Sequence, residues 1–259
     1  MHTKTLITAL CIFVISCQQG NSFTRHQNSE TKPVPAEKTN PYASIAAIPL
    51  PQGFKRQPAD SNSFTAWLRK RELKKDKTVY LFNGNEKENQ KAQFAVLDIP
   101  VGNKDLQQCA DAVMRLRAEY LFDTKRYADI KFFDNANGKY EFTGPYTKTH
   151  FYSFLERVFG MCGSASLSKQ LHKKDAGDIM PGDVFIRGGF PGHAEMVMDV
   201  AVNDSTGKRI FLLAQSYMPA QDIHVLLNPR DEKLSPWYEI EEDIITPEYV
   251  FDKRELKTW

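Results

Sequence analysis

Cys109 and His193 are the residues whose types and positions best suit nucleophilic chemistry. Cys109 lies in the first two turns of a predicted helix, residues 105–122, whose apolar residues recur every three or four positions. Free N–H groups and the dipole at a helix start favour the thiolate, the reactive form of cysteine. A thiolate also needs a base nearby, usually a histidine oriented by a third polar group. The sequence therefore predicts a cysteine nucleophile, provided that a histidine reaches it.

His193 is the histidine expected to act as that base. It follows a glycine-rich loop, residues 187–192, and starts a strand-like run that extends to residue 202. Alternation along the strand places His193, Glu195 and Asp199 on one face, with methionines and valines on the other. Ionisable groups on one face of an otherwise apolar strand require an explanation, and a catalytic base supplies one.

The third group is expected from the partner strand of a hairpin. A turn centred near Ser205 joins this strand to residues 209–217, so residues that face each other have numbers that sum to about 410. That register sets His193 against Tyr217 and brings Gln215 near it on the same face. Gln215 can orient the imidazole, and Glu195 is the nearest competitor for that role. We therefore predict a catalytic trio of Cys109, His193 and Gln215.

Other interpretations of these residues remain open. Cys109 could be an inert core residue or could form a disulfide with Cys162, and Cys162 could itself be the reactive thiol. Gln108, with the glutamine before it, could help to stabilise an oxyanion. Arg187 could hold a substrate carboxylate or lie solvated in its loop. We expect neither metal nor cofactor, because the chain has no H-E-x-x-H, no paired C-x-x-C and no glycine-rich phosphate motif.

The elements around these residues indicate an α+β fold. Helices are predicted near residues 64–68, 151–159 and 166–172, and hairpins are predicted from residues 79–82 with 92–99 and from 130–133 with 139–142. The helix that carries Cys109 should pack on an antiparallel sheet formed largely by the second half of the chain. The first of the hairpins would be an addition at the N-terminal side of the domain.

Composition sets broad limits on function. The chain has 259 residues, a formal net charge of +2 and 4 cysteines. Such a small charge gives no basic surface for nucleic acid, so we expect no nucleic-acid partner. The folded part is expected to be one domain, residues 42–259. Nothing in the sequence indicates the oligomeric state.

The first residues resemble an export signal. Residues 5–15 are mostly apolar but too few to span a bilayer, and the run ends in Val14-Ile15-Ser16-Cys17. This tetrad resembles a bacterial lipoprotein box, which implies cleavage after residue 16 and a lipid on Cys17; a plain signal peptide is the alternative. Residues 17–41 are polar and predicted to be a disordered tether. We expect a lipid-anchored protein of the bacterial cell envelope, on the periplasmic side of the outer membrane.

Two resemblances follow from the motifs. A cysteine at a helix start, Pro181-Gly182-Asp183-Val184-Phe185 and then Gly192-His193 resemble the NlpC/P60 branch of papain-like cysteine peptidases and amidases. That resemblance implies a papain-like core, with Cys109 as nucleophile, His193 as base and Gln215 as orienting group. It departs from the branch at Gln108-Cys109-Ala110, where Asp-Cys-Ser is usual.

A longer resemblance covers nearly the whole folded part. Residues 107–112, 115–120, 181–185, 192–194 and 215–221 are similar to the DUF4846 family of bacterial lipoproteins, found largely in Bacteroidetes, whose function is unknown. We therefore expect an envelope lipoprotein with a cysteine hydrolase site that acts on amides, with peptidoglycan peptides as substrate. The alternative is a binding module on the same fold, in which Cys109 is structural.

Overall fold

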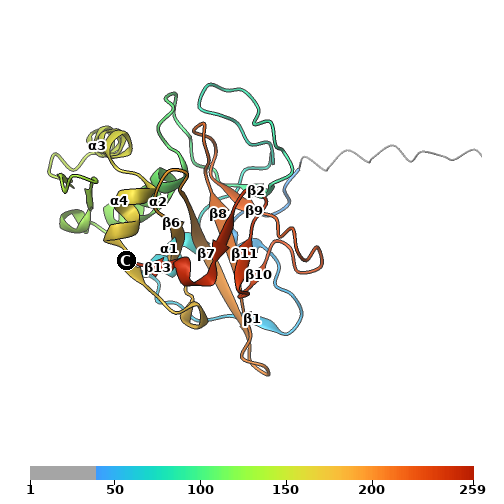
Figure 1. Ribbon diagram of the computed structural model, residues 1–259. Coiled ribbons are helices and arrows are strands. Elements are labelled where there is room, and N and C mark those ends of the chain that lie inside the picture. Colours follow the sequence, from blue (N-terminus) through green and yellow to red (C-terminus); the bar gives the residue numbers. More distant parts are fainter. Residues whose placement is uncertain (1–38) are drawn as a thin grey trace, which may run out of the picture. The chain divides into compact units, whose positions relative to one another are not determined.

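The computed structural model describes residues 39–259, which lie within one compact unit, Glu37–Trp259. The predicted signal peptide, Cys17 and most of the predicted tether lie outside the described residues. The described part is α+β, with a large antiparallel sheet flanked by helices (Figure 1).

The α-helices lie in the first two thirds of the chain. They are α1 (Phe64–Arg69), α2 (Cys109–Asp123), α3 (Lys148–Met161) and α4 (Ser164–Gln170), and the 3-10 turns are η1 (Ile45–Ala47), η2 (Tyr127–Asp129), η3 (Ala176–Asp178) and η4 (Lys253–Glu255). The Ser63 hydroxyl accepts the Ala66 N–H at 3.2 Å and so caps α1.

The strands lie mostly in the second half. They are β1 (Phe54–Arg56), β2 (Gln93–Val96), β3 (Lys131–Phe133), β4 (Lys139–Glu141), β5 (His172–Lys173), β6 (Val184–Arg187), β7 (His193–Asn203), β8 (Arg209–Gln215), β9 (His224–Leu226), β10 (Tyr238–Glu239), β11 (Asp243–Ile245), β12 (Val250–Asp252) and β13 (Leu256–Thr258). The main sheet has the order β2-β9-β8-β7-β6-β13-β5, with β1 paired to β7 and β10 paired to β8. The long strands β7 and β8 form its centre.

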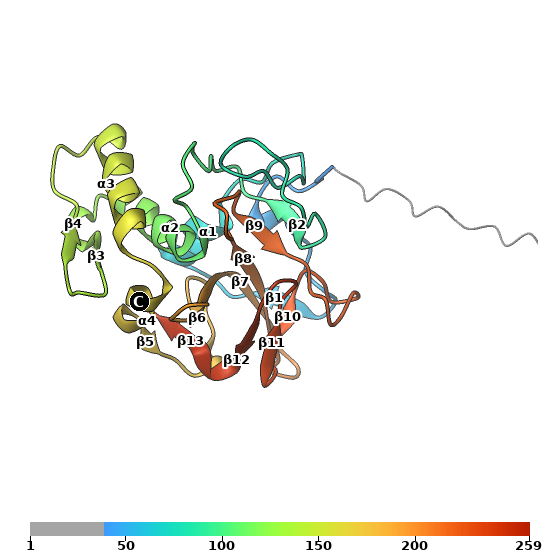
Figure 2. The same ribbon diagram turned by 45° about the horizontal axis from the view of Figure 1, so that its top comes forward.

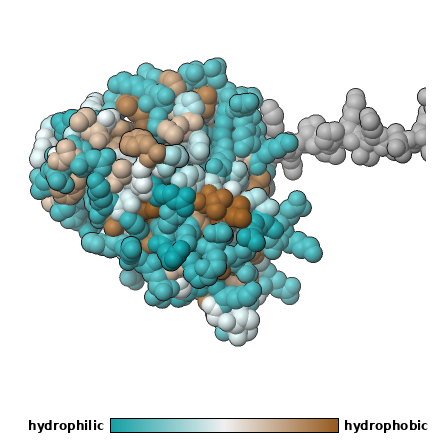
Figure 3. All heavy atoms as spheres, in the orientation of Figure 1, coloured by the Kyte–Doolittle hydropathy of each residue, from teal (hydrophilic) through white to brown (hydrophobic). Residues whose placement is uncertain are grey.

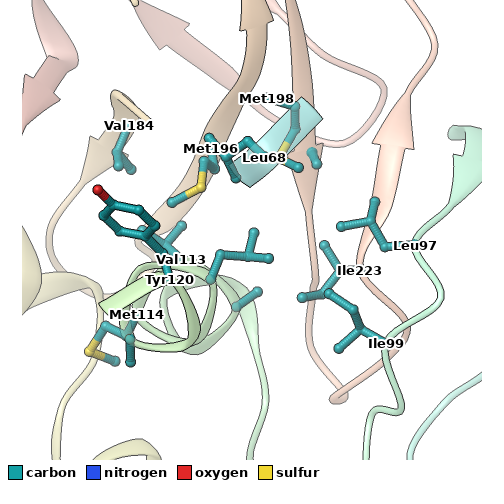
Figure 4. Close-up of a cluster of buried hydrophobic side chains, with 14 of the residues drawn as sticks. Leu68, Leu97, Ile99, Val113, Met114, Tyr120, Val184, Met196, Met198 and Ile223 are labelled. Carbon is teal, nitrogen blue, oxygen red and sulfur yellow. The ribbon is translucent and has the colours of Figure 1, made fainter. Parts of the chain in front are cut away.

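The sheet has an apolar cluster on each face. On one face Met196 of β7 packs with Leu68 of α1 and Val113 of α2, and Figure 4 shows these side chains gathered between α2 and the sheet. On the other face Val197 and Phe211 pack with Phe251 of the β11–β12 hairpin. Figure 2 shows α2 and this hairpin on either side of β7. The central strands are therefore covered on both faces, which explains their nearly continuous burial.

The predicted hairpin of residues 79–82 with 92–99 is wrong. Residues 79–82 fold back on their own turn, where the Leu81 N–H donates to the Asn85 carbonyl at 2.8 Å. β2 pairs instead with β9, which is distant in the sequence. The sheet edge at β9 competes with the local partner, and local pattern cannot foresee that competition. The second predicted hairpin is confirmed as β3 and β4.

A β-bulge in β7 corrects the predicted faces of that strand. Met196 faces Ala214 and Val197 faces Leu213, as the predicted register requires, but the pairing shifts by one between Val197 and Asp199. Beyond the bulge the faces are exchanged. Asp199 therefore bonds Arg69 of α1 on the helix-covered face, whereas Glu195 lies on the opposite face. The prediction that Asp199 shares a face with His193 is wrong.

Candidate active site

The start of α2 is held by the segment that follows β8. The Ser216 hydroxyl lies 2.9 Å from the Gln107 carbonyl oxygen, and the Ala220 N–H donates to Asp105 Oδ1 at 2.7 Å. With residues 105–107 fixed in this way, α2 begins at Cys109 rather than at residue 105. Cys109 is thus the first helical residue, and its N–H has no acceptor within the helix.

Tight loop packing positions His193, the first residue of β7. A side chain on Gly192 would meet Ser164 Oγ at 2.4 Å and the Gly189 carbonyl oxygen at 2.5 Å. Gly189 itself has φ +136, a conformation that other residues rarely adopt. The glycines therefore let the β6–β7 loop lie directly against the start of α4, which brings His193 toward α2.

The Pro181-Gly182-Asp183 motif has a structural role in the same region. Asp183 is buried, accepts the Met180 N–H at 2.7 Å and pairs with Lys174 at 2.7 Å. These bonds hold the turn that leads into β6, the neighbour of the strand that carries His193.

The structure brings Cys109, His193 and Gln215 together. Cys109 lies close enough to the His193 ring to raise its pKa, and His193 Nε2 lies 2.7 Å from Gln215 Oε1. Because Nε2 faces Gln215, Nδ1 is the nitrogen left to face the sulfur. All three residues are buried, with Cys109 at 8% exposure and the other two at 1%. A candidate nucleophile, a candidate base and an orienting group thus lie next to one another in space, in the order that cysteine-dependent acyl transfer requires.

Glu248 fixes the orientation of Gln215. Gln215 Nε2 donates to Glu248 Oε2 at 2.6 Å, and Glu248 also pairs with Lys87. Burial alone would raise the pKa of Glu248, but the bonds from Lys87 and Asn89 lower it overall. An ionised carboxylate only accepts hydrogen bonds, so it must face the NH₂ group of Gln215. The amide oxygen then faces His193 and requires a proton on Nε2.

His224 supports the same orientation from the other side. Its Nδ1–H donates to the Asp222 carbonyl at 2.9 Å, and its Nε2 accepts from Gln215 Nε2 at 3.3 Å. Burial and the charge of Lys87 lower the pKa of His224 to about 3. The ring is therefore neutral, and its free lone pair completes the contacts of the Gln215 amide.

Glu195, like Glu248, is an acidic residue of the site, and it lies close to His193, the candidate base. Its Oε1 lies 3.4 Å from His193 Nε2 and 2.9 Å from the Thr246 hydroxyl. Its Oε2 is buried and has no hydrogen-bond partner among the described residues. Gln215 and Glu195 therefore both contact Nε2. The sequence suggested that the two residues compete for this role, but the structure accommodates both.

The environment of His193 favours the imidazolium. Burial lowers the pKa of His193, but the hydrogen bonds to Cys109 and Glu195 and the charges of both groups outweigh it and raise the pKa to about 10. A charged imidazole beside a cysteine sulfur is the arrangement that favours a thiolate in cysteine nucleophiles.

The thiol opens onto a groove of about 430 Å³. Its walls are the start of α2, the α3–α4 junction with Cys162, the β6–β7 loop and Met218. Cys109 and Cys162 are both free thiols in the structure. Burial, together with the charges of Asp134 and Asp111, raises the pKa of Cys162 to about 12. The groove thus holds one thiol beside a base and one kept protonated.

The structure places the remaining predicted residues less centrally. The Gln108 side chain lines the groove but donates to Asp105 Oδ1 at 3.1 Å. The Tyr217 ring lies 4.9 Å from the His193 ring, centroid to centroid. Arg187 lies in β6 and is exposed, and its guanidinium makes a two-point ion pair with Glu255 instead of lining the groove. Gln108 and Tyr217 border the site, and Arg187 is structural.

Sequence reasoning missed Lys87, His224, Thr246 and Glu248. They come from loops and a short strand scattered between residues 87 and 248, and none lies in a recognisable motif. Only their burial as polar side chains marks them, and that property is visible only in the folded protein.

The raised pKa of His193 predicts a pH-dependent contribution to stability. A base whose pKa rises on folding stabilises the protein fully below its unfolded value of 6.5 and loses this effect as the pH rises toward 10. Glu195→Gln removes one group that holds the pKa up. The free-energy difference in unfolding between wild type and variant should therefore be largest near pH 6, by about 1–3 kcal/mol, and shrink toward pH 10.

Urea denaturation at pH 6, 8 and 10 under reducing conditions measures this difference. A constant offset across the range would show that Glu195 does not act through the imidazolium.

Within residues 39–259 no helix is long and apolar enough to cross a membrane, and no cluster of three or more His, Cys, Asp or Glu residues could hold a metal ion.

Comparison with known proteins identifies a family but assigns no activity to it. No curated protein and no solved structure matches the chain. The family model described as "Domain of unknown function (4846)", DUF4846, matches residues 45–144 and residues 139–258. These ranges include Cys109, His193 and Gln215 and span most of the chain. The chain therefore belongs to the DUF4846 family.

Proposed function

We propose that this protein is a cysteine-dependent hydrolase that cleaves amides or esters by acyl transfer on a papain-like core. The observation that carries the proposal is the contact of Cys109 with His193 at a groove, with His193 Nε2 held 2.7 Å from Gln215 Oε1. Support for the papain-like arrangement comes from the position of Cys109 at a helix start against an antiparallel sheet.

The reaction follows from these positions. The Cys109 thiolate attacks the carbonyl carbon, a C–S bond forms, and the oxyanion lies near the free Cys109 N–H. The bond to the leaving amine or alcohol then breaks, and His193 gives that group its proton. His193 next takes a proton from water, which attacks the thioester, and the C–S bond breaks to release the acid. Gln215 and Glu195 hold the ring in place throughout.

An activated ester tests the proposal without knowledge of the natural substrate. With p-nitrophenyl acetate, the full chain should release nitrophenolate and carry a transient acetyl group on Cys109, found by intact mass and peptide mapping. Cys109→Ser should lose both signals, whereas Cys162→Ser should keep them. Equal rates for wild type and Cys109→Ser, with no adduct, would favour a non-catalytic binding module on the same fold.

The location of the protein is part of the same proposal. The lipoprotein box at residues 14–17 supports a lipid on Cys17 and an anchor in the bacterial cell envelope. In that compartment peptidoglycan peptides are abundant amides, and they are one candidate substrate on grounds of location alone.

Metabolic labelling with palmitate tests the anchor. The wild type and Cys162→Ala should be labelled, and Cys17→Ala should not. Unchanged labelling of Cys17→Ala would contradict the lipid anchor.

A further inference from the structure

Several large apolar side chains that line the groove are exposed to solvent. The exposed large hydrophobic residues among those described are Tyr146, Tyr152, Met161, Met180, Phe190, Met218 and Val250. Three of them, Met161, Phe190 and Met218, line the groove that contains Cys109, with exposures of 55%, 97% and 53%. Single exposed apolar residues are ordinary, but several around one concave site indicate a surface for an apolar ligand.

These three residues, the apolar rim, come from separate parts of the chain. Met161 is the last residue of α3, Phe190 lies in the β6–β7 loop three residues before His193, and Met218 follows Gln215 by three residues. The fold therefore places one apolar side chain on each of three walls of the groove: the α3–α4 junction, the β6–β7 loop and the segment after β8. On the face shown in Figure 3 most of the surface is polar, and the hydrophobic residues form small patches.

The charges of the groove disfavour an anionic ligand. The lining contains no lysine, arginine or histidine, and its carboxyl groups are Asp105 and Asp111. Burial raises the pKa of Asp111 well above its ordinary value, which disfavours a negative charge on this carboxyl. Asp111 Oδ1 is buried and has no hydrogen-bond partner among residues 39–259. A protonated carboxyl can donate to a carbonyl oxygen, whereas a ligand carboxylate would find no lysine, arginine or histidine among the residues that line the groove.

We propose that the groove takes an uncharged peptide-like acyl group with a large apolar side chain next to the carbonyl that Cys109 attacks. This inference rests on the proposed hydrolase function and narrows its substrate class. Met161, Phe190 and Met218 determine the specificity by covering the apolar side chain. Substrates with a free carboxylate beside the cleaved bond, as in many peptidoglycan peptides, are disfavoured.

Three alkylating probes that carry the same reactive iodoacetyl group test the proposal in the full chain. Iodoacetamide is small and neutral, N-benzyl iodoacetamide adds an apolar ring, and iodoacetate is anionic. Each rate at Cys109 is measured by peptide mapping and divided by the rate of the same probe with a small free thiol. The benzyl probe should be favoured over iodoacetamide by about tenfold, as burial of one ring face predicts, and iodoacetate should be disfavoured.

Substitutions at exposed positions show which residues cause the preference for the benzyl probe, and they leave the buried core unchanged. Phe190→Ser combined with Met218→Ser should abolish most of the tenfold preference for the benzyl probe over iodoacetamide. Met180→Ser combined with Val250→Ser, at exposed positions outside the groove, should leave the preference intact.

The outcomes separate the two proposals. Normal iodoacetamide reactivity without a benzyl preference, or with a preference for iodoacetate, overturns the apolar specificity alone. A Cys109 that reacts with none of the probes overturns the hydrolase function and this inference with it.

Discussion

His193→Ala should slow alkylation of Cys109 by iodoacetamide at pH 7 by about 100-fold. In the wild type the imidazolium lies against the sulfur, and the raised pKa of His193, about 10, keeps that positive charge in place at neutral pH. Without the ring, the helix start alone remains to stabilise the thiolate. Peptide mapping of the alkylated protein over time measures the effect at Cys109 itself.

Two further variants control this experiment. His172→Ala removes an exposed histidine of β5 and should leave the rate unchanged. Gln215→Ala keeps His193 and the contact of Nε2 with Glu195 but removes the nearer acceptor at Nε2, so a smaller loss, about tenfold, is expected. If His193→Ala folds as judged by circular dichroism and alkylates at the wild-type rate, the ion pair has no role in reactivity.

Asp199→Ala should lower the free energy of unfolding by about 3–5 kcal/mol. The Asp199 side chain is 0% exposed and pairs with Arg56 and with Arg69, whose own exposures are 21% and 13%. Its loss leaves two guanidinium groups largely buried without their anion. The pairs also join β1 and α1 to β7, so the strand that begins with His193 loses support at its far end. Urea denaturation measures the change.

Asp204→Ala is the matched control. It breaks the Lys55–Asp204 pair, whose side chains are 77% and 67% exposed, and should cost at most about 1 kcal/mol. Equal effects of the two substitutions would mean that the buried network does not hold β7.

The centre of the site was predictable because it depends on short-range rules. The turn at residues 203–207 sets the register of β7 and β8, and the observed pairs Met196–Ala214 and Val197–Leu213 match the predicted sum of 410. That register is what brings Gln215 to His193. The α+β layout and the pairing of β3 with β4 follow from periodicity and turns in the same way.

The rest depends on interactions that local patterns do not encode. The bulge near Met198 reverses the faces of β7, so alternation places Asp199 wrongly. The pairing of β2 with β9 is decided by a sheet edge more than a hundred residues away in sequence. The position of Glu248, which orients Gln215, follows from how the C-terminal segment packs across the sheet. Long-range packing therefore supplies the groups that orient the base.

Competition between the two thiols of the groove tests the central claim most directly. In a single sample of reduced, folded protein, iodoacetamide at pH 7 meets Cys109 beside His193 and Cys162, whose pKa is raised to about 12. Peptide mapping should show Cys109 alkylated at least about 100-fold faster than Cys162. If Cys162 reacts first, or if Cys109 reacts only after the protein is denatured, Cys109 is not an activated nucleophile.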